Sequence, residues 1–324
     1  MAGVQESALA VAVSNAGGLG SLPCALLSPE SLRSELAAMT SGTSRPFNVN
    51  FFCHTPPEPD SEREAAWRAA LRPYYEELGI DIEAVPTGPG RTAFSHDAID
   101  VLAEFKPPVV SFHFGLPPDD LLQRVRALGA MVLSSATTVD EARWLEARGV
   151  DAIIAQGLEA GGHRGMFLSD DMARQTGTST LVRQIVNAVD VPVIATGGIV
   201  DAKAVAKAMA LGAAAVQIGT AYLLCPEATT SAVHRAALNS AAAGQTAVTN
   251  VFTGRPARGI VNRLMREIGP MSDLAPRFPL AAAAVQPLRA AAEARGSGDF
   301  SPLWAGDGAT GCRAIPQPGG APAF

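Results

Sequence analysis

A glycine-rich segment with a single histidine follows an apolar stretch near the middle of the chain. In "IIAQGLEAGGHRGMF", residues 153–167, four glycines surround His163. Glycine tolerates positive φ and lets a backbone approach a ligand closely. A neutral imidazole held beside such a ligand can remove a weakly acidic proton from carbon, so His163 is our candidate general base. A lone histidine is more often structural, and it is the flanking glycines that favour the catalytic interpretation.

Two more glycine turns follow apolar stretches nearer the C-terminus. "ATGGI" contains Gly197 and Gly198, and "QIGTA" contains Gly219 and Thr220. Backbone N–H groups at such turns bind phosphate, and a threonine hydroxyl adds a donor. One turn alone would be an ordinary loop, whereas two in succession favour a phosphate site. The P-loop and GxGxxG patterns are absent, so the sequence indicates FMN rather than a dinucleotide in a Rossmann fold.

Polar side chains end three other apolar stretches. Asn50 and Gln156 are amides that could donate to and accept from a flavin ring, although each could instead cap its strand. His113 in "SFHFG" could face the same pocket or form a hydrogen bond inside a barrel, and both interpretations stay open. No role is predicted for the other three histidines, His54, His96 and His234.

These residues need elements that bring strand ends together. Short apolar runs alternate with helix-like segments, which is typical of a parallel sheet covered on both faces. The candidate residues follow many strands instead of gathering at one switch point, so we predict an α/β fold of the (β/α)8 TIM-type barrel class. Seven strands are expected, at 19–23, 47–52, 107–115, 131–136, 152–157, 191–198 and 214–221.

The strand–helix alternation stops after Tyr222. We predict that residues 1–222 and 288–306 form an FMN-binding barrel. Residues 223–287 are expected to form a small helical domain that covers the substrate, with helices in "ATTSAVHRAALNSA" and "ARGIVNRLMREIG". The Gly/Pro-rich residues 307–324 are expected to form a poorly ordered tail.

Composition limits the class of partner. The 324 residues are 48% hydrophobic and 17% charged, which describes a chain able to bury a large core. A net charge of −6 without a Lys/Arg run predicts no nucleic-acid or membrane-surface partner. Four widely spaced cysteines favour reduced thiols over disulfides or a zinc site. No signal-peptide pattern or run of about 20 apolar residues occurs, so the expected location is the cytoplasm.

Nine motifs in order carry a family resemblance between Met1 and about Gly306. They are "SNAGGLGSL", "FNVNFF", "VVSFHFG", "ATTVDEA", "AQGLEAGGHRG", "PVIATGGI", "AVQIGTAYLLCPEA", "FTGRPARG" and "LWAG". Together they resemble the nitronate monooxygenase family, formerly called 2-nitropropane dioxygenase. The resemblance implies an FMN-dependent barrel that oxidises alkyl nitronates or nitroalkanes with O2 to carbonyl compounds and nitrite.

The same resemblance implies roles for individual residues. His163 matches the family's catalytic base, and His113 matches a histidine that lines the substrate pocket. The nitronate would pass one electron to FMN before O2 captures the radicals. The implied partners are a small nitronate or nitroalkane and O2, with a homodimer as the candidate assembly. The expected FMN contacts, with Gly197 added from its turn, are Asn50, Gln156, Gly161, Gly197, Gly198, Gln217, Ile218, Gly219 and Thr220.

One departure and two rival functions accompany this interpretation. Family members begin with a strand ahead of "MAGV", so we expect a barrel that lacks its first strand. An FMN-dependent, NADH-using enoyl-[acyl carrier protein] reductase shares the TGG and AGGH elements, but Gln156 in "AQGLEAGGH" favours the nitronate enzyme. A catalytically idle flavin-binding barrel is the second alternative.

Overall fold

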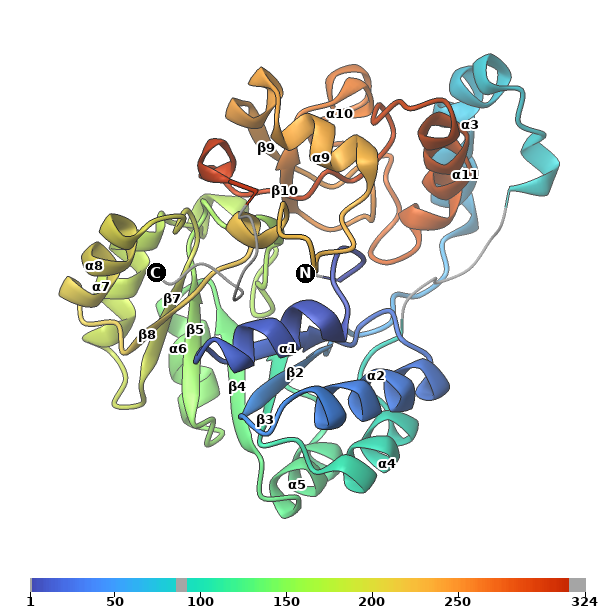
Figure 1. Cartoon of the computed structure of the whole chain (residues 1–324). Coiled ribbons are helices and arrows are strands. Elements are labelled where there is room, and N and C mark those ends of the chain that lie inside the picture. The colour runs from blue at the N-terminus through green and yellow to red at the C-terminus, as the bar shows by residue number, and fades with distance from the viewer. Residues whose placement is uncertain (1, 86–91, 315–324) are drawn as a thin grey trace.

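A parallel sheet dominates the computed structural model, which describes residues 2–85 and 92–314 (Figure 1). Its seven strands lie in the order β1-β2-β3-β4-β5-β7-β8 and curl into a half-barrel of the TIM type. The seven strands predicted from the sequence are therefore confirmed, with shorter bounds for most of them. The strands are β1 (Gly20–Pro23), β2 (Phe47–Phe52), β3 (Val109–His113), β4 (Met131–Ala136), β5 (Ala152–Gln156), β7 (Val193–Thr196) and β8 (Ala215–Gln217).

Helices follow the strands of the half-barrel and pack on its outside. Val49, Phe112 and Ile153 from three strands belong to the main hydrophobic core and are fully buried. Side-chain caps start several of the helices, as where Asp201 accepts from the N–H of Ala204 at the start of α8. The half-barrel helices are α1 (Ser7–Asn15), α2 (Pro29–Gly42), α4 (His96–Phe105), α5 (Asp119–Ala127), α6 (Val139–Glu146), α7 (Thr178–Val186) and α8 (Ala202–Ala210).

Strands β1 and β8 lie at the two ends of the large sheet. Helix α1 packs closely beside β1, where a Cβ atom on Gly20 would collide with the carbonyl of Ala10. The helix also contacts α2 and β2. Tight packing of α1 thus holds this end of the sheet.

A second lobe, residues 61–85 and 232–304, has a hydrophobic core of its own. Trp67 and Tyr75 of α3 donate to the carbonyls of Ala281 and Ala284 in α11, at 3.3 Å and 2.6 Å. Figure 1 shows α3 beside α11, although α3 precedes strand β3 in the chain. The elements of this lobe are α3 (Ser61–Leu78), α9 (Ala232–Leu238), β9 (Thr246–Thr249), β10 (Ala257–Ile260), α10 (Arg263–Glu267) and α11 (Ala281–Ala294).

The second lobe differs in three details from the predicted helical domain. Residues 223–287 contain two strands as well as helices, and β9 and β10 pair with β6 (Gly162–His163) in the order β6-β10-β9. The helix expected over "ARGIVNRLMREIG" begins only at Arg263. The first four of these residues form β10, because pairing with two neighbouring strands outweighs local helix preference. Residues 288–304, expected on the barrel, pack with α3 instead.

The division into domains otherwise stays a prediction. Of the expected tail, residues 307–314 are described and include a short 3-10 turn at Ala309–Gly311, while 315–324 lie outside the described residues. The other 3-10 turns are Ile82–Ala84, Met172–Arg174, Thr220–Tyr222 and Ala241–Gly244.

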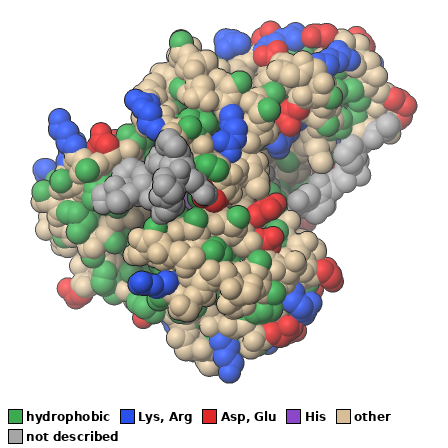
Figure 2. All heavy atoms as spheres, in the orientation of Figure 1, with side chains coloured by type: hydrophobic (Ala, Val, Ile, Leu, Met, Phe, Trp, Pro, Cys, Tyr) green, Lys and Arg blue, Asp and Glu red, His purple; other side chains and the backbone are tan. Residues whose placement is uncertain are grey.

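The charge on the surface and the character of the helices concern possible nucleic-acid and membrane partners. Lys/Arg and Asp/Glu side chains are interspersed on the face drawn in Figure 2. Across residues 2–85 and 92–314, no helix is both long and apolar enough to cross a bilayer.

Candidate active site

A cavity of about 240 Å³ opens at the carboxyl ends of the strands of the half-barrel. Trp304 of the second lobe closes part of it. The structure brings all the predicted site residues together, because this one cavity is lined by Asn50, His113, Gln156, Gly161, His163, Gly197, Gly198, Gln217, Ile218, Gly219 and Thr220.

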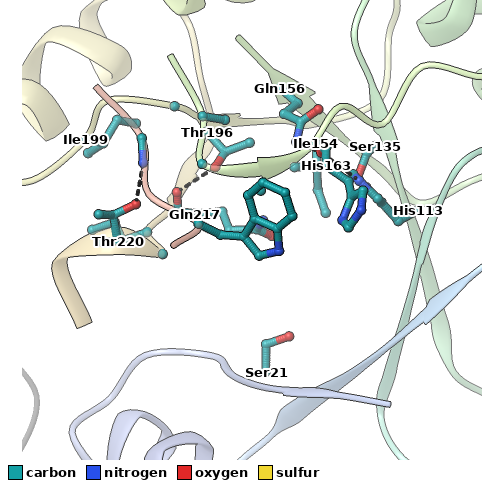
Figure 3. Close-up of a pocket in the computed structure, with 18 of the residues that line it drawn as sticks. Ser21, His113, Ser135, Ile154, Gln156, His163, Thr196, Ile199, Gln217 and Thr220 are labelled. Carbon is teal, nitrogen blue, oxygen red and sulfur yellow. Dashed lines mark hydrogen bonds between the residues drawn. The ribbon is translucent and has the colours of Figure 1, made fainter. Parts of the chain in front are cut away.

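The lining separates into two groups (Figure 3). Thr196, Gln217 and Thr220 lie at one end, whereas Gln156, His113 and His163 lie at the other. Ser21 of β1 faces both groups from across the cavity. The cavity therefore has a backbone-rich end and a histidine end.

Glycine conformation shapes the backbone-rich end. Gly197 and Gly198 have φ values of +125° and +68°, which side chains rarely adopt. A Cβ atom on Gly197 would lie 2.5 Å from the hydroxyl of Thr178. Within the described residues, the N–H groups of Gly197, Gly198, Gly219 and Thr220 donate to no other protein atom. Four backbone donors at one end of a cavity form a cradle suited to a phosphate.

The Thr220 hydroxyl belongs to the same cradle. Its Oγ1 accepts from the N–H of Gly306 at 3.0 Å, which leaves its own hydrogen for a ligand oxygen. The thiol of Cys312 donates to the Thr220 carbonyl at 2.9 Å. Residues 306–312 thus close this end of the cavity, a contact that the motif "QIGTA" did not predict.

His163 lies on β6 and is held from both sides. Its backbone pairs with Ala257 of β10, and its carbonyl accepts from the side chains of Gln156 and His113 at 2.9 Å and 3.1 Å. Its Nε2 lies 2.9 Å from the hydroxyl of Thr253. The side chain is 8% exposed. The candidate base is therefore buried and fixed by both sheets.

Hydrogen bonding determines the tautomer of His113. A carbonyl only accepts, so the His113 Nε2 that meets the His163 carbonyl carries the hydrogen. Nδ1 then accepts from the hydroxyl of Ser135 at 2.8 Å. Burial lowers the pKa of His113 to about 3, with the charges of Arg255 and Arg164 acting in the same direction. His113 is a neutral hydrogen-bond donor at neutral pH.

The two amides at the strand ends are already engaged within the protein. Gln156 accepts from the N–H of Gly165 at 2.7 Å as well as donating to His163, so it braces the glycine segment. Asn50 donates to the hydroxyl of Ser111 at 2.8 Å. Of the two, Asn50 keeps an Oδ1 that accepts from none of the described residues.

Sequence reasoning missed a buried arginine beneath the glycine segment. Arg164 is 0% exposed and donates to the carbonyls of Gly157 and Gln156 at 2.6 Å and 2.7 Å. It also donates to the side chain of Gln175. Burial lowers the pKa of Arg164 to about 10, so it stays charged at neutral pH. Its position directly after His163 was the available signal.

Aromatic rings surround the imidazole and were also missed. Phe278 and Trp304 lie 5.3 Å and 5.4 Å from the His163 ring, centroid to centroid, and Phe52 lies 6.1 Å away. Such a wall shields the imidazole from water. The motif "LWAG" contains Trp304, but its letters alone do not place the ring. The histidine end is suited to taking a proton from an uncharged organic substrate.

Comparisons with known proteins agree along nearly the whole chain. A family model described as nitronate monooxygenase matches residues 1–318. A nitronate monooxygenase from Pseudomonas aeruginosa is 43% identical, covering 98% of this chain and 91% of the relative. A nitroalkane oxidase structure from Streptomyces ansochromogenes matches with a TM-score of 0.87 and 37% identity over 98% of this chain and 90% of that one. A structure of FabK from Thermotoga maritima matches with a TM-score of 0.68 and 27% identity. The match covers 97% of this chain and 86% of that one.

Proposed function

The chain belongs to the nitronate monooxygenase family and is an oxidoreductase, and from that premise we propose an FMN-dependent oxidation with His163 as the base. The substrates are alkyl nitronates and nitroalkanes, and the products with O2 are carbonyl compounds and nitrite. The observation that carries the proposal is that a glycine cradle and a buried imidazole line one cavity.

The residues present fit a flavin mononucleotide. Four N–H groups without acceptors among the described residues and the Thr220 hydroxyl would hold its phosphate. The Oδ1 of Asn50 would meet the polar edge of the ring system. When bound, the flavin supplies the electron transfer from nitronate towards O2, which no side chain described here could perform.

The protein's own contribution is orientation and proton removal. His163 takes the carbon-bound proton of a neutral nitroalkane and thereby produces the nitronate, while the aromatic wall keeps water away. His113 and Gln156 hold the His163 carbonyl, so the ring keeps its place during the transfer. A substrate that is added as nitronate does not need this step.

Exchanging the base tests the proposal. We expect purified protein to show flavin absorption bands and to release nitrite from nitroethane and from its nitronate. His163→Asn should keep the flavin bands and lose roughly 100-fold or more of the activity on the neutral nitroalkane, since general base catalysis contributes about that much. Activity on preformed nitronate should fall far less.

Three results would contradict this function. Nitrite release from the neutral nitroalkane that is unchanged in His163→Asn, with flavin retained, would remove the base. Rapid anaerobic bleaching of the flavin by NADH would favour the enoyl reductase, and bound flavin without turnover would favour the idle barrel. The cytoplasmic location and the homodimer stay predictions of the sequence.

A further inference from the structure

One hydrogen bond crosses from the second lobe to the candidate base. The hydroxyl of Thr253 lies 2.9 Å from Nε2 of His163, and the two residues are 2% and 8% exposed. At this distance Thr253 occupies the Nε2 direction, so a substrate carbon has no room there. If the ring acts as the base, the proton of a substrate would therefore reach it at Nδ1.

The turn that carries Thr253 is rigidly built. The N–H groups of Thr253 and Gly254 both donate to the carbonyl of Asn250, at 3.3 Å and 2.7 Å. The Asn250 side chain in turn exchanges two hydrogen bonds with the backbone of Ser272, each 2.9 Å long. Gly254 has a φ of +85°, and a Cβ there would collide with the Pro276 carbonyl. The hydroxyl is thus presented to His163 from a fixed position.

We propose that Thr253 is a positioning residue that accepts a hydrogen bond from Nε2–H of His163 and so keeps the lone pair of the neutral ring on Nδ1. This inference rests on the proposed role of His163 as the base. An imidazole can exist as either of two neutral tautomers, and a partner on one nitrogen selects between them.

The proton balance follows from that assignment. The neutral nitroalkane loses its carbon-bound proton to Nδ1, and the electron pair of the broken C–H bond remains on the nitronate. The ring becomes an imidazolium with hydrogens on both nitrogens, and the oxygen of Thr253 goes on accepting from Nε2–H. One hydroxyl thus serves the ring before and after the transfer without moving.

Paired variants of Thr253 separate positioning from simple packing. Thr253→Val keeps the shape but lacks an acceptor, so turnover of neutral nitroethane should fall by roughly 10- to 100-fold, part of the base's contribution. Turnover of preformed nitronate should stay within about threefold, because no proton is removed. Thr253→Ser should restore most of the nitroalkane activity.

A matched control lies in the same lobe. Thr249 is fully buried and its hydroxyl donates to the carbonyl of Pro270 at 2.6 Å. Among the described residues, none of the hydrogen bonds given for His113 or His163 involves this hydroxyl. Thr249→Val should therefore destabilise the lobe without changing the ratio of nitroalkane to nitronate turnover. An equal loss on both substrates in Thr253→Val would overturn the proposal.

A second measurement does not depend on turnover. Nuclear magnetic resonance of isotope-labelled histidine in the flavin-loaded enzyme should report neutral His163 as the Nε2–H tautomer, with His163→Asn identifying its signals. Thr253→Ser should retain that tautomer, and Thr253→Val should change or mix it. An Nδ1–H tautomer in the unmodified protein would refute the assignment even if nitronate turnover is normal. Absence of all nitronate turnover would instead refute the proposed function and leave the tautomer measurement valid.

Discussion

At the scale of single residues, His113 and His163 share a hydrogen bond but have different partners for their ring nitrogens. His113 donates to the carbonyl of His163 and accepts from Ser135, so both of its nitrogens are used within the protein. His163 presents Nε2 to Thr253 and lines the cavity with its ring. We therefore propose that His113 holds the carbonyl of His163 in place and that His163 removes the substrate proton.

The depressed pKa of His113 predicts a loss of stability in acid. Its folded pKa of about 3 lies below the unfolded value near 6.5, so the unfolded chain binds the extra proton between these values. His113 therefore lowers stability progressively as the pH falls below about 6.5, and has no effect above it. Between about pH 7.5 and about pH 5, the free energy of urea unfolding should fall by up to about 2 kcal/mol more in the unmodified protein than in His113→Gln.

A matched comparison isolates this residue. His234 has a pKa lowered to about 4 by burial and responds in the same direction, but it does so equally in both proteins. An identical pH dependence in the two proteins would mean that His113 is not held neutral by its surroundings.

The sequence was informative about residues whose role depends on their own backbone. Gly197 and Gly198 were identified because their turn requires a conformation that glycine tolerates. Thr253 and Arg164 were missed because their roles depend on contacts that the fold creates. Thr253 meets a ring ninety positions earlier in the chain, and nothing near it in sequence signals that contact.

At the scale of elements, a short chain of hydrogen bonds ties helix α7 to the glycine turn after β7. The carboxylate of Glu159 accepts from the N–H and the hydroxyl of Thr178, at 2.7 Å and 2.8 Å. The Thr178 hydroxyl also lies 3.0 Å from the carbonyl of Gly197. A negative charge at a helix N-terminus is favourable, so Glu159 caps α7 from outside it.

Breaking this chain should weaken flavin binding. Thr178→Val removes the hydroxyl that steadies Gly197, so the cradle loses part of its preorganisation. The Kd for FMN, measured by fluorescence titration, should rise by roughly 10-fold, equivalent to about 1.4 kcal/mol. Thr180→Val on the exposed side of the same helix is the control and should leave the Kd unchanged. Equal Kd values for the two variants would show that α7 does not support the cradle.

Elements were predictable where their own residues carry a pattern. The strands of the half-barrel are apolar runs bounded by turns, and all seven were found. Strand β6 has two residues, one of them glycine, and exists because β10 pairs with it. Residues 288–294 of α11 were expected on the barrel, since their sequence does not say which of two cores they contact.

At the scale of the whole molecule, two hydrophobic cores share one chain that crosses between them. After β2 the chain leaves the half-barrel and forms α3, which packs on α11. It then returns to the half-barrel with α4 and β3. Trp67 is 1% exposed at the centre of the second core. The lobe is thus stabilised by a helix that the sequence alone would assign to the barrel.

Truncating Trp67 should loosen the lobe selectively. Trp67→Ala leaves a large cavity and should cost roughly 3–5 kcal/mol. Hydrogen exchange should accelerate in the peptides of residues 246–304 and at β6, while β3, β4 and β5 stay protected. Leu145→Ala, at a fully buried position of α6, should give the opposite pattern. Uniform acceleration in both variants would mean that the molecule unfolds as one unit.

The antiparallel pairing of β6 with β10 ties His163 to the second lobe, whereas the proposed phosphate cradle lies at the glycine turns of the half-barrel. Under the proposed function, the path of the substrate proton to the imidazole would therefore depend on how the two sheets meet. Substitutions in β9 and β10 should therefore alter kinetic isotope effects and their temperature dependence while leaving every chemical group of the site in place.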